Sequence, residues 1–214
     1  MGLLGFVGCS SDFFYAYRDK HTDLYGIKNQ AGHVIVPPQY EMIFAAQDEK
    51  LFHPSNPNYL YLVPVQKKGS FFLISKDGVP IFRSVYHDNG HDYYIEGLAR
   101  FIEKGKDGKD RVGFHDREGK IVIPARYDFA GPFNNGYEFV NNGCWMQETK
   151  LKKYPPVSGH PFPPPFAEPS WEYSKVLKGG LWGAINLKGQ EVIPIVYKND
   201  QEVSTLLEKK FGWV

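Results

Sequence analysis

The densest group of side chains able to hold a metal ion lies in the segment HDNGHD, residues 87–92. His87, Asp88, His91 and Asp92 supply imidazoles and carboxylates, which are ligand types for divalent cations. Their spacing matches no defined metal-binding motif. Asp-Asn-Gly is also ordinary turn chemistry, because these residues accept tight backbone conformations. We therefore predict a polar turn without a cofactor, and these four residues remain the metal-ligand candidates.

The sequence carries no signature of a catalytic nucleophile, such as G-x-S-x-G. Cys9 and Cys144 form neither a disulfide framework nor a metal-binding spacing. Cys9 lies between small apolar residues and serines, so that residues 3–11 resemble the end of a bacterial lipoprotein signal without its basic start. This resemblance implies an N-terminal segment, residues 1–12, with Cys9 as a lipid anchor. The protein would then belong to the bacterial cell envelope and meet the membrane through that lipid; the alternative is a cytoplasmic protein.

A proline-rich stretch, residues 144–175, contains seven prolines and many aromatic residues. Proline fixes φ and donates no ladder hydrogen bond, so we predict a long, partly polyproline loop outside the sheet. The loop could act as a lid or partner-binding arm, or it could pack over an open end of the sheet. We favour packing, because stacked repeats need capping. The partner-binding candidates are Phe162, Phe166, Trp171 and Tyr173.

The element that must position these groups is a repeat that occurs four times. In three copies a glycine is followed by a second glycine at offset six, a proline at offset eleven and a tyrosine at offset fourteen. These copies are Gly26, Gly32, Pro37, Tyr40; Gly113, Gly119, Pro124, Tyr127; and Gly183, Gly189, Pro194, Tyr197. A fourth, degenerate copy keeps Gly78 and Tyr86 but has Phe72 in place of the first glycine and Arg83 in place of the proline. Internal repeats of this kind fix the architecture.

Each copy predicts a β-hairpin. Asn, Asp or Ser begins a four-residue turn that ends at the second glycine, which suits a type I turn followed by a glycine at positive φ. The β-branched residues that follow favour a strand, and the proline should end that strand or place it at a sheet edge. Alternation in residues 97–102 and 136–140 predicts a third strand before the hairpin. We predict an all-β fold of antiparallel repeats with buried tyrosines, as a curved meander that is open or closed like a barrel or propeller.

These repeats resemble the WG-repeat family, named for the Trp-Gly that opens the unit. Residues 181–197, LWGAINLKGQEVIPIVY, match the family pattern closely, whereas other copies have Tyr25, Phe71 or Val112 in place of the tryptophan. Residues 211–214, FGWV, resemble the opening of a fifth unit. The resemblance covers most of residues 13–214 and implies a bacterial β-repeat protein without family catalytic residues.

The length and the net charge of the chain limit its domain organisation and the classes of function it can have. A chain of 214 residues can bury one core, so we predict one domain over residues 13–214 with the insertion at 144–175. The formal net charge is +1 and basic residues occur at most in pairs, which argues against nucleic-acid binding. No stretch reaches the ~18 apolar residues of a membrane span. Nothing reads as a long amphipathic helix.

Two functions remain from this sequence. The favoured hypothesis is a non-catalytic binding or scaffold protein, whose protein or glycan partner contacts a repeat-built β surface and the aromatic proline-rich loop. The alternative is a glycan- or peptide-acting hydrolase with its site near the degenerate second repeat, where paired carboxylates would be needed. The lack of a motif with catalytic geometry favours binding.

Overall fold

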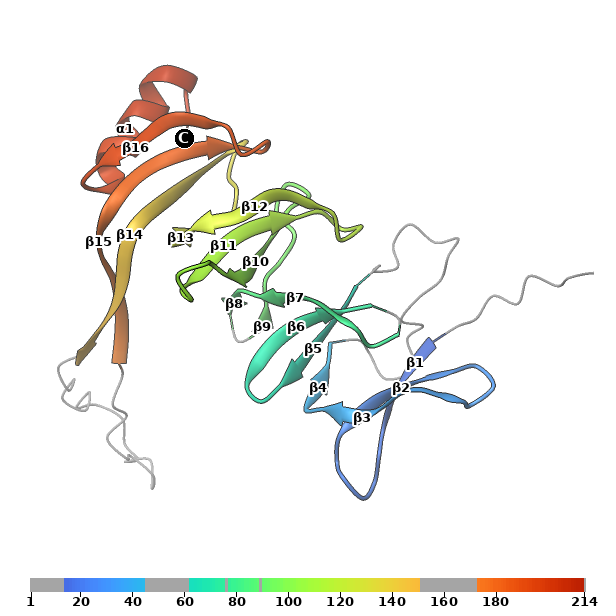
Figure 1. Ribbon diagram of the computed structural model, residues 1–214. Coiled ribbons are helices and arrows are strands. Elements are labelled where there is room, and N and C mark those ends of the chain that lie inside the picture. Colours follow the sequence, from blue (N-terminus) through green and yellow to red (C-terminus); the bar gives the residue numbers. More distant parts are fainter. Residues whose placement is uncertain (1–13, 45–61, 76, 89, 151–172, 214) are drawn as a thin grey trace, which may run out of the picture.

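The protein is an elongated, open array of antiparallel β-sheets with one helix (Figure 1). The structure, a computed structural model, describes residues 14–44, 62–75, 77–88, 90–150 and 173–213. The elements are β1 (Phe14–Arg18), β2 (Tyr25–Asn29), β3 (Val34–Tyr40), β4 (Met42–Ile43), β5 (Val63–Lys67), β6 (Ser70–Ile74), β7 (Pro80–Ser84), β8 (Tyr86–His87), β9 (Gly90–His91), β10 (Ala99–Lys104), β11 (Asp110–His115), β12 (Ile121–Tyr127), β13 (Phe129–Ala130), β14 (Tyr137–Lys150), β15 (Tyr173–Asn186), β16 (Glu191–Tyr197) and α1 (Asp200–Phe211).

The strands group into four three-stranded units, as the repeat predicted. Unit 1 is β1-β2-β3, unit 2 is β5-β6-β7, unit 3 is β10-β11-β12 and unit 4 is β14-β15-β16. The units follow one another from one end of the molecule to the other, and units 1 and 4 lie at opposite ends (Figure 1). The all-β prediction is confirmed, and the array is open.

A wide bulge distorts units 1, 3 and 4 at the same place. In unit 1, Tyr25 pairs with Tyr40 and Ile27 pairs with Val36. An advance of two residues along β2 therefore corresponds to an advance of four residues along β3. The same count recurs in the pairs Val112–Tyr127 and Phe114–Ile123, and in Trp182–Tyr197 and Ala184–Ile193. The extra residues on the second strand of each hairpin include the repeat proline. The three strands concerned, β3, β12 and β16, are edge strands, as predicted for proline, although each continues to the tyrosine.

The first glycine of the repeat is required by this bulge. A Cβ on Gly26 would stand 2.5 Å from the carbonyl oxygen of Val36. A Cβ on Gly113 would likewise stand 2.7 Å from the carbonyl oxygen of Ile123. Any side chain would therefore collide with the backbone of the neighbouring strand. The bulge explains why a glycine and a proline recur eleven residues apart.

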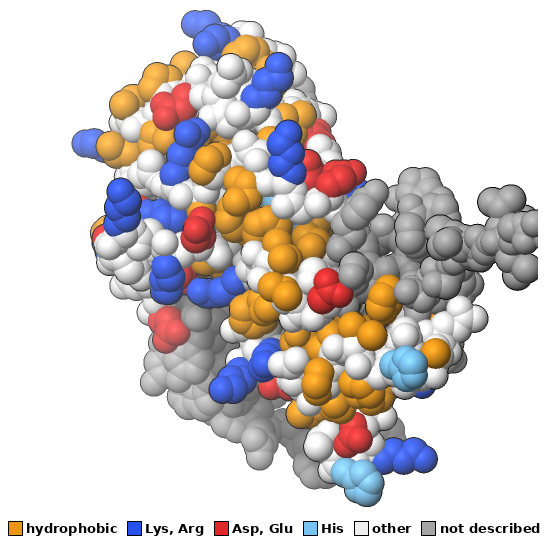
Figure 2. Space-filling view, turned by 45° about the vertical axis from the view of Figure 1, so that its right-hand side comes forward, with side chains coloured by type: hydrophobic (Ala, Val, Ile, Leu, Met, Phe, Trp, Pro, Cys, Tyr) orange, Lys and Arg blue, Asp and Glu red, His pale blue; other side chains and the backbone are white. Residues whose placement is uncertain are grey.

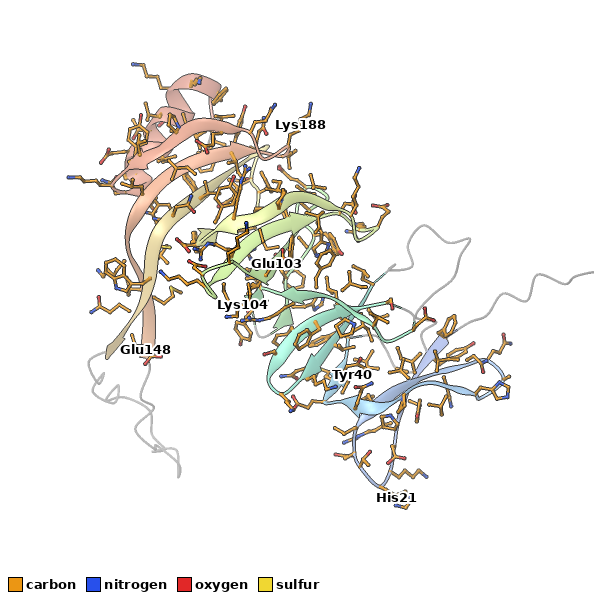
Figure 3. All side chains as sticks on the ribbon, in the orientation of Figure 1. His21, Tyr40, Glu103, Lys104, Glu148 and Lys188 are labelled. Atoms are coloured by element: carbon orange, nitrogen blue, oxygen red, sulfur yellow. The ribbon has the colours of Figure 1, made fainter. Side chains whose placement is uncertain are left out.

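The second glycine closes each turn, and in units 2, 3 and 4 it also lies against the preceding unit. Gly32, Gly78, Gly119 and Gly189 have φ values of 85°, 77°, 81° and 73°, which confirms the predicted turn. Gly78 packs against Val36, and the hydroxyl of Tyr40 donates to its carbonyl oxygen at 3.3 Å. Gly189 packs against Ile123 in the same way. Figure 3 shows Tyr40 near the start of the array and Lys188 at the exposed tip of a turn.

Unit 2 is built differently. Phe72 pairs with Arg83 and Leu73 with Phe82, so the ladder runs through the repeat position without the bulge. The straight β7 then pairs with β10 through Ser84. Units 2 and 3 thereby share one seven-stranded sheet of order β12-β11-β10-β7-β6-β5-β4. The prediction that Tyr86 is buried is wrong, because the chain leaves the sheet after Ser84 and carries Tyr86 to the surface, where it is 62% exposed. Tyr40 and Tyr127 are buried, as predicted, and Tyr197 is partly buried.

The prediction of a loop over residues 144–175 is wrong at its two flanks. Residues 144–150 and 173–175 continue β14 and β15 as a two-stranded arm rather than a loop. These flanks contain no proline, so their backbone amides can extend the ladder. The arm projects away from the sheets, with Glu148 far from the body of unit 4 (Figures 1 and 3). Residues 151–172 lie outside the described part of the chain.

The C-terminus is a helix, and the prediction of a fifth unit is wrong. Asn199 caps α1 because its side-chain oxygen accepts from the backbone amide of Glu202, and its side-chain Nδ2 donates to the Glu202 carboxylate. Gly212 ends the helix with φ 65°. Val203 and Leu207 bury one face of α1 against unit 4. The capping pair and the apolar spacing could have predicted this helix. It covers the end of the array, the role that we had assigned to the proline-rich segment.

A candidate aromatic binding surface at the second repeat

The candidate site lies where the repeat is broken. After β7 the chain forms a small hairpin, β8-β9, in which Tyr86 pairs with His91 and His87 with Gly90. Asp88 turns the chain with φ 42°. We call the side chains gathered here the aromatic surface, which comprises Phe44, Phe71, Tyr86, His87, His91 and Tyr93. Hydrophobic side chains reach the exterior in several places (Figure 2), but here rings come from three separate parts of the chain.

The rings of the aromatic surface form a continuous chain of contacts. Phe44 lies 5.5 Å from Phe71 and 5.2 Å from His91, between ring centroids. Tyr93 meets both imidazoles edge-on, at 5.5 Å from His87 and 5.9 Å from His91. Phe71 is buried, whereas Tyr93 is 49% exposed. Such offset and edge-to-face pairs are favoured by ring quadrupoles, so the buried rings support the exposed ones.

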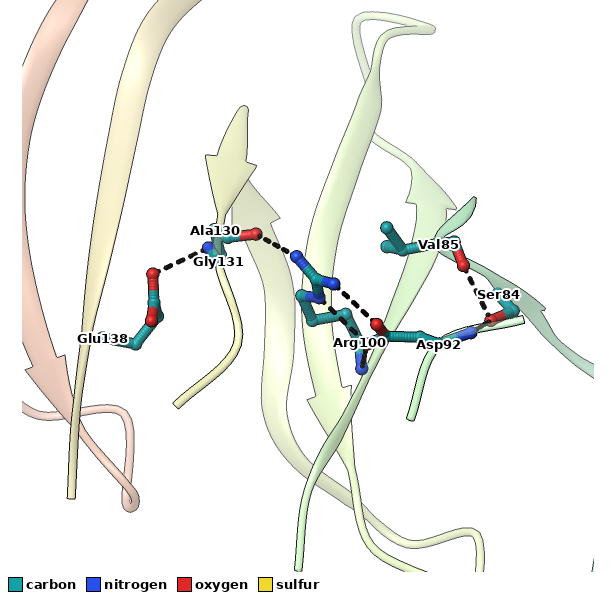
Figure 4. Close-up of polar contacts among 7 residues, drawn as sticks. All are labelled: Ser84, Val85, Asp92, Arg100, Ala130, Gly131 and Glu138. Carbon is teal, nitrogen blue, oxygen red and sulfur yellow. Dashed lines mark hydrogen bonds and ion pairs between the residues drawn. The ribbon is translucent and has the colours of Figure 1, made fainter. Parts of the chain in front are cut away.

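Asp92 anchors this surface to the sheet (Figure 4). Its amide donates to Ser84 Oγ at 2.8 Å. Its carboxylate receives Nε and Nη2 of Arg100 at 2.9 and 2.6 Å, and the Arg100 amide at 2.8 Å. Arg100 Nη1 continues to the carbonyl of Ala130 at 3.1 Å. Both charged side chains are more than 90% buried, and the bidentate pair holds the residues on either side of Asp92 in place.

The two imidazoles differ in surroundings. His91 is partly buried, and burial lowers its pKa against the opposing effect of Asp92. Its imidazole is therefore neutral at pH 7. Its Nδ1 atom is buried and has no hydrogen-bond partner among the described residues. His87 packs its ring on Tyr93.

Three segments of the chain match the family model described as the WG containing repeat: residues 25–51, 113–143 and 182–199. The chain carries WG-containing repeats. The matched segments begin in the bulged hairpins of units 1, 3 and 4, and none of them covers the hairpin of unit 2. The aromatic surface thus lies at the one repeat that departs from the WG pattern.

Searches of curated proteins and of solved structures found no match to this WG-repeat chain. Among the described residues, no helix has the length and apolar character needed to cross a bilayer.

The metal-ligand candidates are brought near one another but not into a ligand cluster. Asp92 points inward to Arg100, while Asp88 lies on the exposed turn. His87 and His91 both face Tyr93. Within the described ranges, no group of three or more His, Cys, Asp or Glu side chains could hold an ion.

The other sequence candidates lie elsewhere. Cys9, Phe162, Phe166 and Trp171 fall outside the described residues, and Tyr173 is the first residue of β15. Their lipidation and partner-binding roles stay predictions.

Sequence reasoning missed several residues that matter here. Tyr93 directly follows the HDNGHD segment and could have been noticed as an aromatic neighbour of two histidines. Phe44 carries no such signal, because it comes from a distant position in the chain. Arg100 is eight residues from Asp92, but the sequence does not show that its side chain turns back to that carboxylate. Glu138 was missed as well; its carboxylate is buried and accepts from the amide of Gly131 at 2.8 Å (Figure 4).

Glu138 has an unusual acidity. Burial raises its pKa to about 8, against the opposing effects of the Gly131 amide and the Arg100 charge. It is therefore largely protonated at neutral pH. His115 is fully buried as well, and burial lowers its pKa. Its ring stacks on Phe82 of unit 2 at a centroid distance of 4.2 Å. Neither Glu138 nor His115 is one of the residues of the aromatic surface.

Proposed function

We propose that this protein is a non-catalytic binding protein of the bacterial cell envelope and that the aromatic surface is where its partner binds. The observation that carries the proposal is the pair of exposed tyrosines, Tyr86 and Tyr93, displayed at the one repeat that lacks the bulge. Exposed aromatic rings on a supported surface are typical of recognition sites. The repeats serve as the scaffold that holds them.

The carboxylates near the surface support binding over hydrolysis. A glycosidase needs two acids on either side of the scissile bond. Asp92 is committed to Arg100 by both of its oxygens, and Asp88 stands on an exposed turn. Glu138 is buried against the amide of Gly131. Each of these acids has a structural or solvent-exposed setting, whereas Tyr86 and Tyr93 are 62% and 49% exposed and can be reached by a partner.

The envelope assignment rests on residues 3–11, which resemble the end of a lipoprotein signal around Cys9. It is tested separately from binding. The full-length native protein should partition with membranes, and Cys9→Ser should release it. Native protein recovered from the cytosol with residues 1–9 intact would remove the envelope assignment and leave the binding role in place.

The binding role is tested by sedimentation with isolated envelope fragments. The purified chain should co-sediment with fragments from the native organism, and the double variant Tyr86→Ala/Tyr93→Ala should stay in the supernatant. Val79→Ala is the matched control, because Val79 is an exposed apolar residue of unit 2 outside the aromatic surface. Circular dichroism and the unfolding midpoint establish that each variant is folded. Equal sedimentation of the double variant and the control would refute the proposed site.

A further inference from the structure

We propose that the aromatic surface binds an uncharged carbohydrate by stacking a sugar ring on Tyr93 and neighbouring rings. This inference rests on the proposed binding function and names the chemical class of the partner. It follows from three properties: the absence of Lys and Arg from residues 84–95, the anchoring of Asp92 by Arg100, and the combination of exposed phenol rings with polar atoms.

Charge argues against an anionic partner. Residues 84–95, which form the hairpin and its flanks, contain no Lys or Arg. Arg100 lies behind them and is occupied by Asp92 and the carbonyl of Ala130. The His91 imidazole is neutral. Phosphate or carboxylate recognition uses cationic donors, and this segment supplies none.

The ring types also argue against a cationic partner. Cages for quaternary ammonium groups are lined by Trp, Tyr and Phe faces. Here the rings in contact with Tyr93 are the imidazoles of His87 and His91, at interplanar angles of 89° and 60°. The phenol of Tyr93 is 49% exposed and offers a flat ring to solvent as a platform. A flat ring suits a flat ligand face.

A pyranose ring offers such a face. Its axial C–H bonds form an apolar surface with slight positive charge, which is complementary to the negative face of an aromatic ring. Its hydroxyl groups need hydrogen-bond partners at the edge of the platform. The tyrosine hydroxyls and the imidazole nitrogens of His87 are such partners, and each of these groups can both donate and accept in its neutral form.

The hydrogen bonds of Asp92 hold the residues of the site in place, which favours binding by weak stacking contacts. Sugars bind proteins through few strong contacts, so ordering the site on binding would consume much of the affinity. Asp92 lies between His91 and Tyr93 in the chain and is fixed to Arg100 by three hydrogen bonds. The platform is therefore formed before the ligand arrives.

The test is a nuclear magnetic resonance titration with uncharged hexasaccharides: chitohexaose, cellohexaose and maltohexaose. At least one should shift the ring signals of Tyr93 and His87 in a saturable manner. Tyr93→Ala should weaken that binding about tenfold, as the loss of ~1.4 kcal/mol of aromatic stacking would. Tyr93→Phe should retain most of the affinity, because it keeps the ring face. Val79→Ala is again the matched control.

Choline and a hexamer of galacturonate serve as cationic and anionic comparison ligands. Saturable shifts with either but not with the neutral sugars would overturn the inference, as would neutral-sugar binding that survives Tyr93→Ala. Failure of all three sugars while envelope sedimentation still depends on the tyrosines would reject the carbohydrate and leave the binding function standing. Envelope sedimentation that is unchanged in the double variant Tyr86→Ala/Tyr93→Ala would reject the binding function itself.

Discussion

Unit 2 differs from units 1, 3 and 4 in one local feature, the bulge, and the rest of its differences follow from it. In the three bulged units a glycine lies opposite the extra residues of the neighbouring strand. The strands that carry those extra residues, β3, β12 and β16, lie at the edges of their sheets. Unit 2 has Phe72 in place of the glycine and Arg83 in place of the proline, and its ladder is regular there. A regular β7 can accept β10 as a neighbour, which the bulged edges do not.

Because of this difference, residues 85–93 of unit 2 do not take part in the pairing between units. In units 1 and 3, the tyrosine ends the strand and is buried, and the next short strand, β4 or β13, pairs directly with the following unit. In unit 2 that pairing is made by β7 itself, so residues 85–93 are not needed for the ladder. They form the β8-β9 hairpin and display Tyr86 and Tyr93. The loss of a structural motif in one repeat thus creates a surface that the other repeats lack.

The strongest test of this view removes the anchor of the freed segment. Asp92→Ala should lower the free energy of unfolding by ~3–5 kcal/mol, because it leaves the buried Arg100 without its partner. Chemical denaturation measures the change. The double variant Asp92→Ala/Arg100→Met should recover part of the loss, since it also removes the unpaired charge. A loss below ~1 kcal/mol for Asp92→Ala would mean that the segment is not anchored by this pair.

A second test compares the acids at two unit junctions. Asp92, between units 2 and 3, has a cationic partner, whereas Glu138, near the junction of units 3 and 4, relies on an amide. Because the folded-state pKa of Glu138 is raised from 4.5 to about 8, its contribution makes the protein less stable as pH rises through that window and constant above it. Glu138→Gln keeps the acceptor for Gly131. It should nearly match the native chain at pH 4.5 and exceed its stability by ~4–5 kcal/mol at pH 9.

The measurement is the unfolding free energy of both chains from pH 4.5 to 9. His115 and His91 have lowered pKa values, so their contributions are lost as pH falls below ~6.5. Both chains share these histidines, and the difference between them isolates Glu138. A difference that does not change with pH would contradict a protonated Glu138.

A third test breaks the bulge directly. Gly113→Ala should cost ~2–3 kcal/mol, because its Cβ would stand 2.6 Å from the amide nitrogen of Ala125 and 2.7 Å from the carbonyl oxygen of Ile123. Gly90→Ala is the matched control within unit 2, where the new Cβ meets no atom closer than 3.8 Å. The control should change the midpoint of thermal unfolding by less than a degree or two. Equal effects of the two substitutions would show that the bulge does not require glycine.

The sequence was sufficient for features that depend on local residue types. Turn glycines, edge prolines and paired strands follow from φ preferences and missing amide donors, and these were predicted correctly. The exposure of Tyr86 could not be predicted from its register alone. It depends on β7 pairing with β10, a contact between residues far apart in the chain. The FGW ending misled because residue types alone do not give the backbone conformation. Gly212 caps a helix with φ 65°, whereas the opening glycines Gly26 and Gly113 lie in strands and are not at positive φ.

The smallest expected effect separates two roles of the turn glycine. Gly32→Ala and Gly78→Ala both force alanine into positive φ, which costs ~1 kcal/mol. A Cβ on Gly32 meets nothing within 4 Å, whereas one on Gly78 would stand 2.6 Å from a methyl of Val36. Val36 is buried and β-branched, so it cannot rotate away cheaply. Gly78→Ala should therefore cost ~1 kcal/mol more than Gly32→Ala, measured as a further drop of a few degrees in the midpoint of thermal unfolding. Gly119→Ala should fall between them, because its Cβ would make ordinary contact with Leu62 at 3.4 Å. If all three variants lose the same stability, the glycines serve only their own turns, and the contact between units 1 and 2 depends instead on the surrounding apolar residues.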